Sequence, residues 1–140
     1  MALPSDFNSA LATVEQMGIL NEDPQTIENR LALSVQHAAL STGQRDMSDL
    51  GIGDWTLGVI RRLKLAIHRE ICDPEKKTIK EDYKSLLDMG LSNQGITAVS
   101  VVVTGVVSAI NPAFAVSNVV IFLSIWVLKR GLAHLCSDPV

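Results

Sequence analysis

Four side chains in this 140-residue sequence have the types and spacing of metal ligands or of a nucleophilic pair. His68 and Cys72 lie one helical turn apart, so both can face one ion, and two cysteines with two histidines form an accepted zinc set. His134 and Cys136 would complete the set, but their His-x-Cys spacing matches no zinc motif. A Cys72–His68 nucleophile pair has no oxyanion site near it in the sequence. We therefore expect no metal, no cofactor and no catalytic residue here.

Motifs for catalysis and nucleotide binding are missing from the sequence. It contains no Gly-x-Ser-x-Gly, no His-Glu-x-x-His, no glycine-rich phosphate loop and no dinucleotide fingerprint. The net charge of −3 lacks the basic footprint of a nucleic-acid-binding domain, and aromatic residues are only 4% of the chain, too few for stacking platforms. We predict that the protein is not an enzyme and does not bind nucleic acid.

The two cysteines are too few for a disulfide scaffold. The first six residues contain no basic segment and no early apolar run, which argues against a cleaved signal peptide. We therefore expect synthesis in the cytoplasm with both thiols reduced.

Charge placement divides the chain near residue 88. Residues 1–54 carry a net charge of −6, residues 55–88 carry +2, and residues 89–140 carry +1. No charged residue occurs over 89–128, a tract of 40 residues. We predict an amphipathic helical region over 1–88 and a hydrophobic helical hairpin with a short polar tail over 89–140, together forming one structural unit in an all-α fold.

The region 1–88 predicts four amphipathic helices, because apolar residues recur every three or four positions between clear breaks. The helices are expected after Asp6, from Pro24, after Asp54 and over residues 76–87. Their apolar faces are carried by Phe7, Leu11, Val14 and Met17; by Ile27, Leu31, Val35 and Ala38; by Trp55, Val59, Leu63, Ile67 and Ile71; and by Ile79, Tyr83, Leu86 and Leu87.

The third of these helices is basic, with Arg61, Arg62 and Arg69 beside an apolar face that begins at Trp55. Such a helix is typical of a segment that lies in a membrane interface. The same pattern is also typical of a solvated surface helix packed on a core. We predict that Trp55 and these arginines contact either lipid or a partner.

The charge-free tract is divided by Asn111–Pro112 into arms of 22 and 16 residues. Both arms are rich in β-branched residues, so strands are an alternative. Each apolar stretch is, however, far longer than a typical strand of about 5–6 residues, and no turn residues interrupt it. A helical hairpin turning at Pro112 is therefore expected.

Small residues recur along both arms, and such stripes let helix backbones approach closely in lipid. They are Ala98, Gly105 and Ser108 in the first arm, and Ala113, Ser117 and Ser124 in the second. Trp126, Lys129 and Arg130 lie where an interfacial anchor and a positive cytoplasmic flank of a membrane hairpin would be expected. These residues are the predicted membrane-facing or interface positions.

This layout of amphipathic helices, one of them basic, followed by an apolar hairpin resembles that of pore-forming colicin domains and of small viral or phage membrane-permeabilising proteins. The resemblance covers the whole chain and implies a toxin or defence effector that inserts a transmembrane hairpin, alone or as a homo-oligomer, to remodel or permeabilise a membrane. Both termini would then lie on the cytoplasmic side.

A second reading comes from the length of the first arm. Its uninterrupted apolar part, residues 95–110, spans about 24 Å as a helix, short of the ~30 Å hydrocarbon core. The alternative function is therefore a soluble all-helical interaction or oligomerisation module with the hairpin as its core or interface. The expected partner is membrane lipid in the first reading and an apolar protein surface in the second.

Overall fold

The computed structural model describes residues 3–42, 52–72 and 91–137, and within these ranges it contains helices and no strand. The helical prediction for the charge-free tract is therefore correct over its described part. The fourth amphipathic helix, predicted over 76–87, lies outside the described residues. In chain order the described elements are α1 (Phe7–Gln16), the 3-10 helix η1 (Ile19–Asn21), α2 (Pro24–Thr42), α3 (Ile52–Cys72), α5 (Asn93–Ile110), the 3-10 helix η3 (Pro112–Phe114) and α6 (Ser117–Ser137).

The first helix follows its predicted apolar spacing. Phe7, Leu11 and Val14 are buried, whereas Met17, expected on the same face, is exposed. The exposure of Met17 follows from the helix end, since α1 stops at Gln16 and Gly18 adopts a left-handed backbone with φ of 71°. Glycine takes up this conformation without the steric penalty of a Cβ atom, so it suits a helix terminus.

The second helix begins at Pro24, as predicted, because proline already has a helical φ and lacks the N–H that a first turn leaves unpaired. The side chain of Asp23 caps it, with the Thr26 N–H donating to Asp23 Oδ1 at 2.8 Å. Its predicted apolar residues are all buried: Ile27, Leu31, Val35 and Ala38.

The third helix begins at Ile52, two residues before the cap predicted at Asp54. Its inner side is apolar, and Leu63 and Ile67 have no exposed surface. Arg61, Arg62 and Arg69 are exposed on its other side. The basic amphipathic character predicted for this segment is therefore present in the structure.

The hairpin consists of two helices of different character. The first, α5, begins after Ser92, whose Oγ accepts a hydrogen bond from the Gly95 N–H at 3.0 Å. The turn lies at Asn111–Pro112 as expected, and Asn111 Oδ1 accepts from the Ala113 N–H at 3.0 Å. The single turn of η3 then separates the turn from α6, which starts at Ser117.

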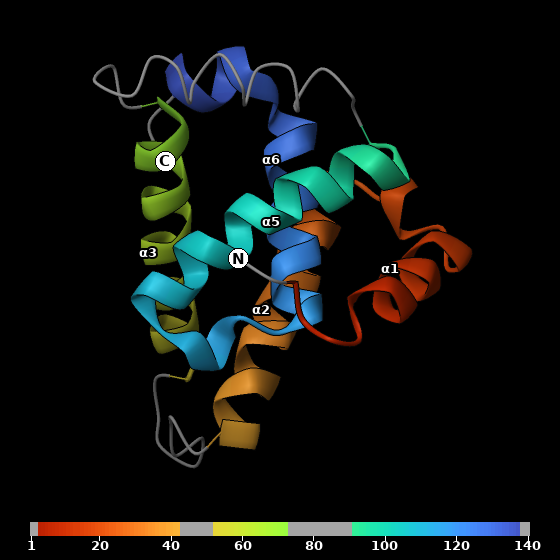
Figure 1. The fold of residues 1–140 in the computed structure, drawn as a ribbon. Coiled ribbons are helices and arrows are strands. Elements are labelled where there is room, and N and C mark those ends of the chain that lie inside the picture. The colour runs from red at the N-terminus through yellow and green to blue at the C-terminus, as the bar shows by residue number, and fades with distance from the viewer. Residues whose placement is uncertain (1–2, 43–51, 73–90, 138–140) are drawn as a thin grey trace.

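The second arm of the hairpin is the central helix of the molecule. Every residue from Val119 to Leu128 is buried. Four helices pack around α6, namely α1, α2, α3 and α5. Figure 1 shows this arrangement, with α5 crossing one side of the bundle between α3 and α1. A helix that is apolar on all sides is stable in water only when it is enclosed in this way.

Candidate functional site

The helix α5 has one buried face and one uncharged face toward solvent. Ile96, Val99, Val103 and Val107 are buried on the inner side, where α5 packs on α6 and α3. The opposite side, called here the outer face of α5, consists of Ala98, Val101, Val102, Gly105 and Ala109. These five residues recur at helical spacing and are exposed or half-buried.

The outer face of α5 is apolar although it is accessible. Val101 is 39% exposed, and Ile110 at the end of the helix is 40% exposed. A Cβ added at Gly105 would meet no atom within 4 Å, so this glycine faces open space. Gly105 therefore does not lie between the two arms, where the small-residue pattern had suggested a close approach of their backbones. Ala98 shares the same side of the helix, and Ser108 is half-buried near it.

The two arms meet instead through a buried polar contact. The hydroxyl groups of Ser100 and Ser124 lie 2.9 Å apart, and neither side chain has exposed surface. Ser124 Oγ also donates to the Val120 carbonyl at 2.8 Å, and Thr104 Oγ1 donates to the Ser100 carbonyl at 2.7 Å. Because each hydroxyl has a partner, this polar group can be buried between two apolar helices without an unsatisfied donor.

The start of the second arm is bound to the N-terminal helix. Ser117 is buried, and its Oγ donates to Asp6 Oδ1 just before α1. At the other end of α1, Asn93 Nδ2 donates to Glu15 Oε1 at 3.0 Å, which connects α1 to the beginning of α5. Both arms are thus held to α1 by polar contacts. Pro112, predicted at the turn, is exposed there.

Trp126 was predicted to be an interfacial anchor, but in this structure it is a core side chain with 6% exposure. The Lys64 ammonium lies 5.0 Å from the centroid of its ring, and the Arg130 guanidinium lies 5.7 Å away. Lys64 also pairs with Glu28 on α2. Lys129 and Arg130 are half-buried and line a 140 Å³ cavity with Trp126. Trp126 can reach lipid only if α6 leaves the bundle.

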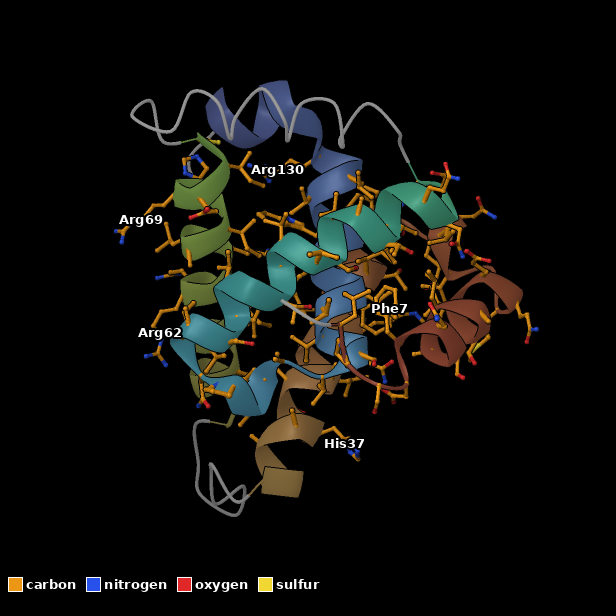
Figure 2. All side chains as sticks on the ribbon, in the orientation of Figure 1. Phe7, His37, Arg62, Arg69 and Arg130 are labelled. Carbon is orange, nitrogen blue, oxygen red and sulfur yellow. The ribbon has the colours of Figure 1, made fainter. Side chains whose placement is uncertain are left out.

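The arginines of α3 are placed differently from the basic residues of α6. Figure 2 shows Arg62 and Arg69 projecting away from the bundle on the α3 side. Arg61 is exposed as well. Since α3 packs beside α5, the molecule carries exposed positive charge next to an uncharged helix. Trp55 belongs to α3, but its side chain lies outside the described part of the structure.

The structure corrects the prediction of reduced thiols, because Cys72 is disulfide-bonded. Its sulfur is therefore neither a thiolate ligand for a metal nor a nucleophile in this state. His68 is half-buried in the preceding turn of α3. The side chains of His134 and Cys136 lie outside the described residues. No cluster of three or more potential metal ligands occurs among the described side chains.

A surface groove between α1 and α2 was not anticipated from the sequence. Two adjoining cavities of 370 and 500 Å³ share Leu33, Ser34 and Asn118. Leu33 on one wall is 66% exposed, and Met17 on the other is 62% exposed. The groove was missed because Leu33 breaks the apolar periodicity of α2 and gives no signal of its own.

Charged groups near the start of α2 stabilise the bundle rather than form a site. Arg30 donates to both carboxylate oxygens of Glu22, at 2.5 and 2.9 Å, and these bonds lower the pKa of Glu22 below its usual range. The Thr26 N–H lowers the pKa of Asp23 in the same way, with a smaller contribution from the charge of Lys129. Both carboxylates are thus kept ionised in defined structural roles.

Among the described residues, α5 is the one helix that is long and apolar enough to cross a membrane, and 39% of it is buried inside the protein. Core helices of soluble proteins also pass a test on length and composition. Comparisons with protein families, with curated proteins and with solved structures find no match for this chain.

Proposed function

We propose that this chain is a small helical membrane-binding protein that attaches through the outer face of α5. In a second step the hairpin of α5 and α6 leaves the bundle and enters the bilayer, where it remodels or permeabilises the membrane. The observation that carries the proposal is the uncharged α5 at the surface, with Val101 and Ile110 about two-fifths exposed. A soluble helix normally places charged residues on such a face.

Electrostatics supports a negatively charged membrane as the target. Arg61, Arg62 and Arg69 are exposed on α3, which packs beside α5. A basic residue close to an anionic lipid surface contributes about 1 kcal/mol of binding. Apolar burial by α5 and attraction by α3 would therefore act together, as in amphipathic interfacial helices.

The length of α5 favours attachment before insertion. Its 18 residues correspond to about 27 Å, slightly less than the ~30 Å hydrocarbon core. Residues 119–128 of the other arm are buried among four helices, so this segment has no free surface for lipid in the closed bundle. Insertion consequently requires the bundle to open, and the enclosed state is the form that exists in water.

A second candidate function uses the same face for protein binding. The open space at Gly105 and the small neighbouring residues would let another helix backbone approach closely, as in a homo-oligomer or an apolar complex. The protein would then be a soluble interaction module, with α6 as its permanent core.

Vesicle co-sedimentation separates the two candidates. Wild type should pellet with vesicles containing anionic lipid at low salt, and less with zwitterionic vesicles. Val101→Asp, which places a charge on the outer face of α5, should abolish pelleting, whereas Leu33→Asp on α2 should not. Leu33 is the more exposed of the two, so this control matches the chemistry and the accessibility of the change.

Wild-type protein that stays in the supernatant with anionic vesicles would refute membrane binding. In that case, an oligomer that Val101→Asp converts to a monomer would establish the interaction module.

A further inference from the structure

A small cavity lies between the start of α2 and the second half of α6, and the proposed membrane function gives it no role. It has a volume of 140 Å³, and its described lining residues are Pro24, Ile27, Trp126, Lys129 and Arg130. Ile27 and Trp126, the large apolar residues of its wall, are buried in the core. Two of the described lining residues carry positive charge and none of them is acidic. The cavity therefore has the charge of an anion-binding site.

The two cations converge on the cavity although they are consecutive in the sequence. Neighbouring residues of an α-helix point about 100° apart, so long side chains at consecutive positions normally diverge. Lys129 and Arg130 nevertheless line the same cavity, and both are half-buried. The Arg130 guanidinium also lies 5.7 Å from the centroid of the Trp126 ring, within the range of a cation–π interaction. These cations are thus held in place by the fold, unlike the exposed arginines of α3.

Two carboxylates near the start of α2 have other partners. Glu28 pairs with Lys64, a third cation that lies 5.0 Å from the centroid of the Trp126 ring. Asp23 caps α2, and the charge of Lys129 is the last of the causes that lower its pKa. Neither carboxylate is among the described lining residues. Two positive charges that share a small cavity repel each other, and an anion bound between them would reduce this repulsion.

We propose that this cavity binds a single dianionic phosphate group. Its volume sets the size of the ligand: at about 30 Å³ for each water-sized atom, 140 Å³ holds roughly four or five heavy atoms, as a phosphate group requires. The base and sugar of a nucleotide do not fit beside it. A phosphomonoester carries close to two negative charges at pH 7, which matches the two cations.

The two cations would bind the phosphate in different ways. The Lys129 ammonium supplies a compact positive charge with three N–H donors. The Arg130 guanidinium has five N–H donors in a planar fork, so it can bind a phosphate oxygen in addition to its other contacts. Because the cavity walls come from α2 and α6, a bound phosphate would connect these two helices and raise the melting temperature. The site exists in the closed bundle, so this inference does not rest on membrane insertion.

Calorimetric titration of the whole chain with inorganic phosphate, at constant ionic strength balanced by chloride, tests the site. Wild type should bind saturably. Lys129→Gln should weaken binding by roughly tenfold or more, because it removes a charge-assisted contact. Lys129→Arg, which keeps the charge, should bind within about threefold of wild type. Arg62→Gln removes one positive charge from an exposed position on α3 and should change the affinity by less than about twofold.

Trp126 gives a second measurement that does not depend on the folding of a Lys129 variant. In Trp55→Phe it is the only tryptophan, since the sequence contains two. Its ring forms a wall of the cavity, so its emission should change as inorganic phosphate is added and should saturate with the affinity found by calorimetry. An emission that does not respond to phosphate would place any binding elsewhere and overturn the proposal.

The phosphate could be free in solution or belong to a lipid headgroup, and two arms of the experiment distinguish these sources. Inorganic phosphate and glycerol 3-phosphate represent the soluble ligand. Phosphatidylcholine vesicles containing phosphatidic acid represent the headgroup, and vesicles of equal charge containing oleate are their control. Binding of the soluble phosphates without a preference for phosphatidic acid over oleate identifies a soluble ligand. A preference for phosphatidic acid that Lys129→Gln removes identifies a lipid headgroup.

The proposal would be overturned if neither the soluble phosphates nor phosphatidic acid bound saturably. Equal weakening by Lys129→Gln and Arg62→Gln would also overturn it, because the attraction would then come from the overall charge. The proposed membrane function fails separately from this site. Val101→Asp changes the outer face of α5 and leaves the cavity as it is, so it should bind inorganic phosphate like wild type whether or not the protein binds vesicles.

Discussion

Replacing Val103 and Val101 separately by alanine tests which side of α5 faces the core. Val103 has no exposed surface, whereas Val101, two positions earlier, is 39% exposed. Removing two buried carbon atoms at about 0.8 kcal/mol each gives ~1.6 kcal/mol, and an unfilled cavity raises this to ~2–3 kcal/mol. Alanine regains roughly 0.5 kcal/mol through its higher helix propensity. Val103→Ala should therefore lower the unfolding free energy by ~2 kcal/mol.

The same substitution at Val101 should change stability by less than about 0.5 kcal/mol, because little packing is lost and the propensity gain remains. Urea titration of the oxidised variants, followed by circular dichroism at 222 nm, gives both values if the slope of the transition is unchanged. Equal losses at the two positions, or a larger loss at Val101, would refute the orientation of α5 on which the proposed function depends.

Three further predictions concern the contacts that hold the bundle together. Ser124→Ala should lower the unfolding free energy, measured by denaturant titration, by ~1–3 kcal/mol. Ser100→Ala should lower it less, because Ser124 keeps its hydrogen bond to a main-chain carbonyl when the Ser100 hydroxyl is removed. The folded state lowers the pKa values of Glu22 and Asp23, so their contribution to stability is complete above their ordinary pKa values of 4.5 and 3.8 and is lost as the pH falls through their pKa values in the folded state. The melting temperature should therefore be flat near neutral pH and fall below about pH 4.5. In Asp23→Asn this fall should be less steep. Cys72→Ser should lower the unfolding free energy by ~2–4 kcal/mol, the typical contribution of a disulfide, and an effect near zero would show that the bond does not form in solution.

Periodicity and turn residues were sufficient to predict the helical class and several helix limits. Pro24 starts a helix, Gly18 follows the end of another, and Asn111–Pro112 separates the two arms. These features are local, because they depend on backbone conformations that individual residues prefer or forbid. The apolar stripe of α2 was likewise predictable, since Ile27 and Leu31 are separated from polar positions by a clear period.

The hairpin shows where sequence reasoning stops. Its residues are apolar on every side, so no period indicates that Val103 is inside and Gly105 outside. Burial of Trp126 was missed for a related reason. A tryptophan followed by Lys129 and Arg130 is the order expected of an interfacial anchor, but a tryptophan buried in a core can have the same basic neighbours. The disulfide bond of Cys72 also depends on tertiary proximity, because no local pattern around a cysteine indicates a bonded partner. These three features are set by packing between elements.

The central claim is that the outer face of α5 contacts lipid, and a fluorophore placed on that face tests it directly. Among the described residues no thiol is free in the oxidised protein, because Cys72 is disulfide-bonded, so an environment-sensitive dye can be attached to Val101→Cys, with Leu33→Cys as the exposed control on α2. On addition of anionic vesicles, the dye at position 101 should shift its emission to shorter wavelength and be quenched by lipid-borne quenchers, while the dye at position 33 should not change. An unchanged spectrum at position 101, or equal shifts at both positions, would contradict the account.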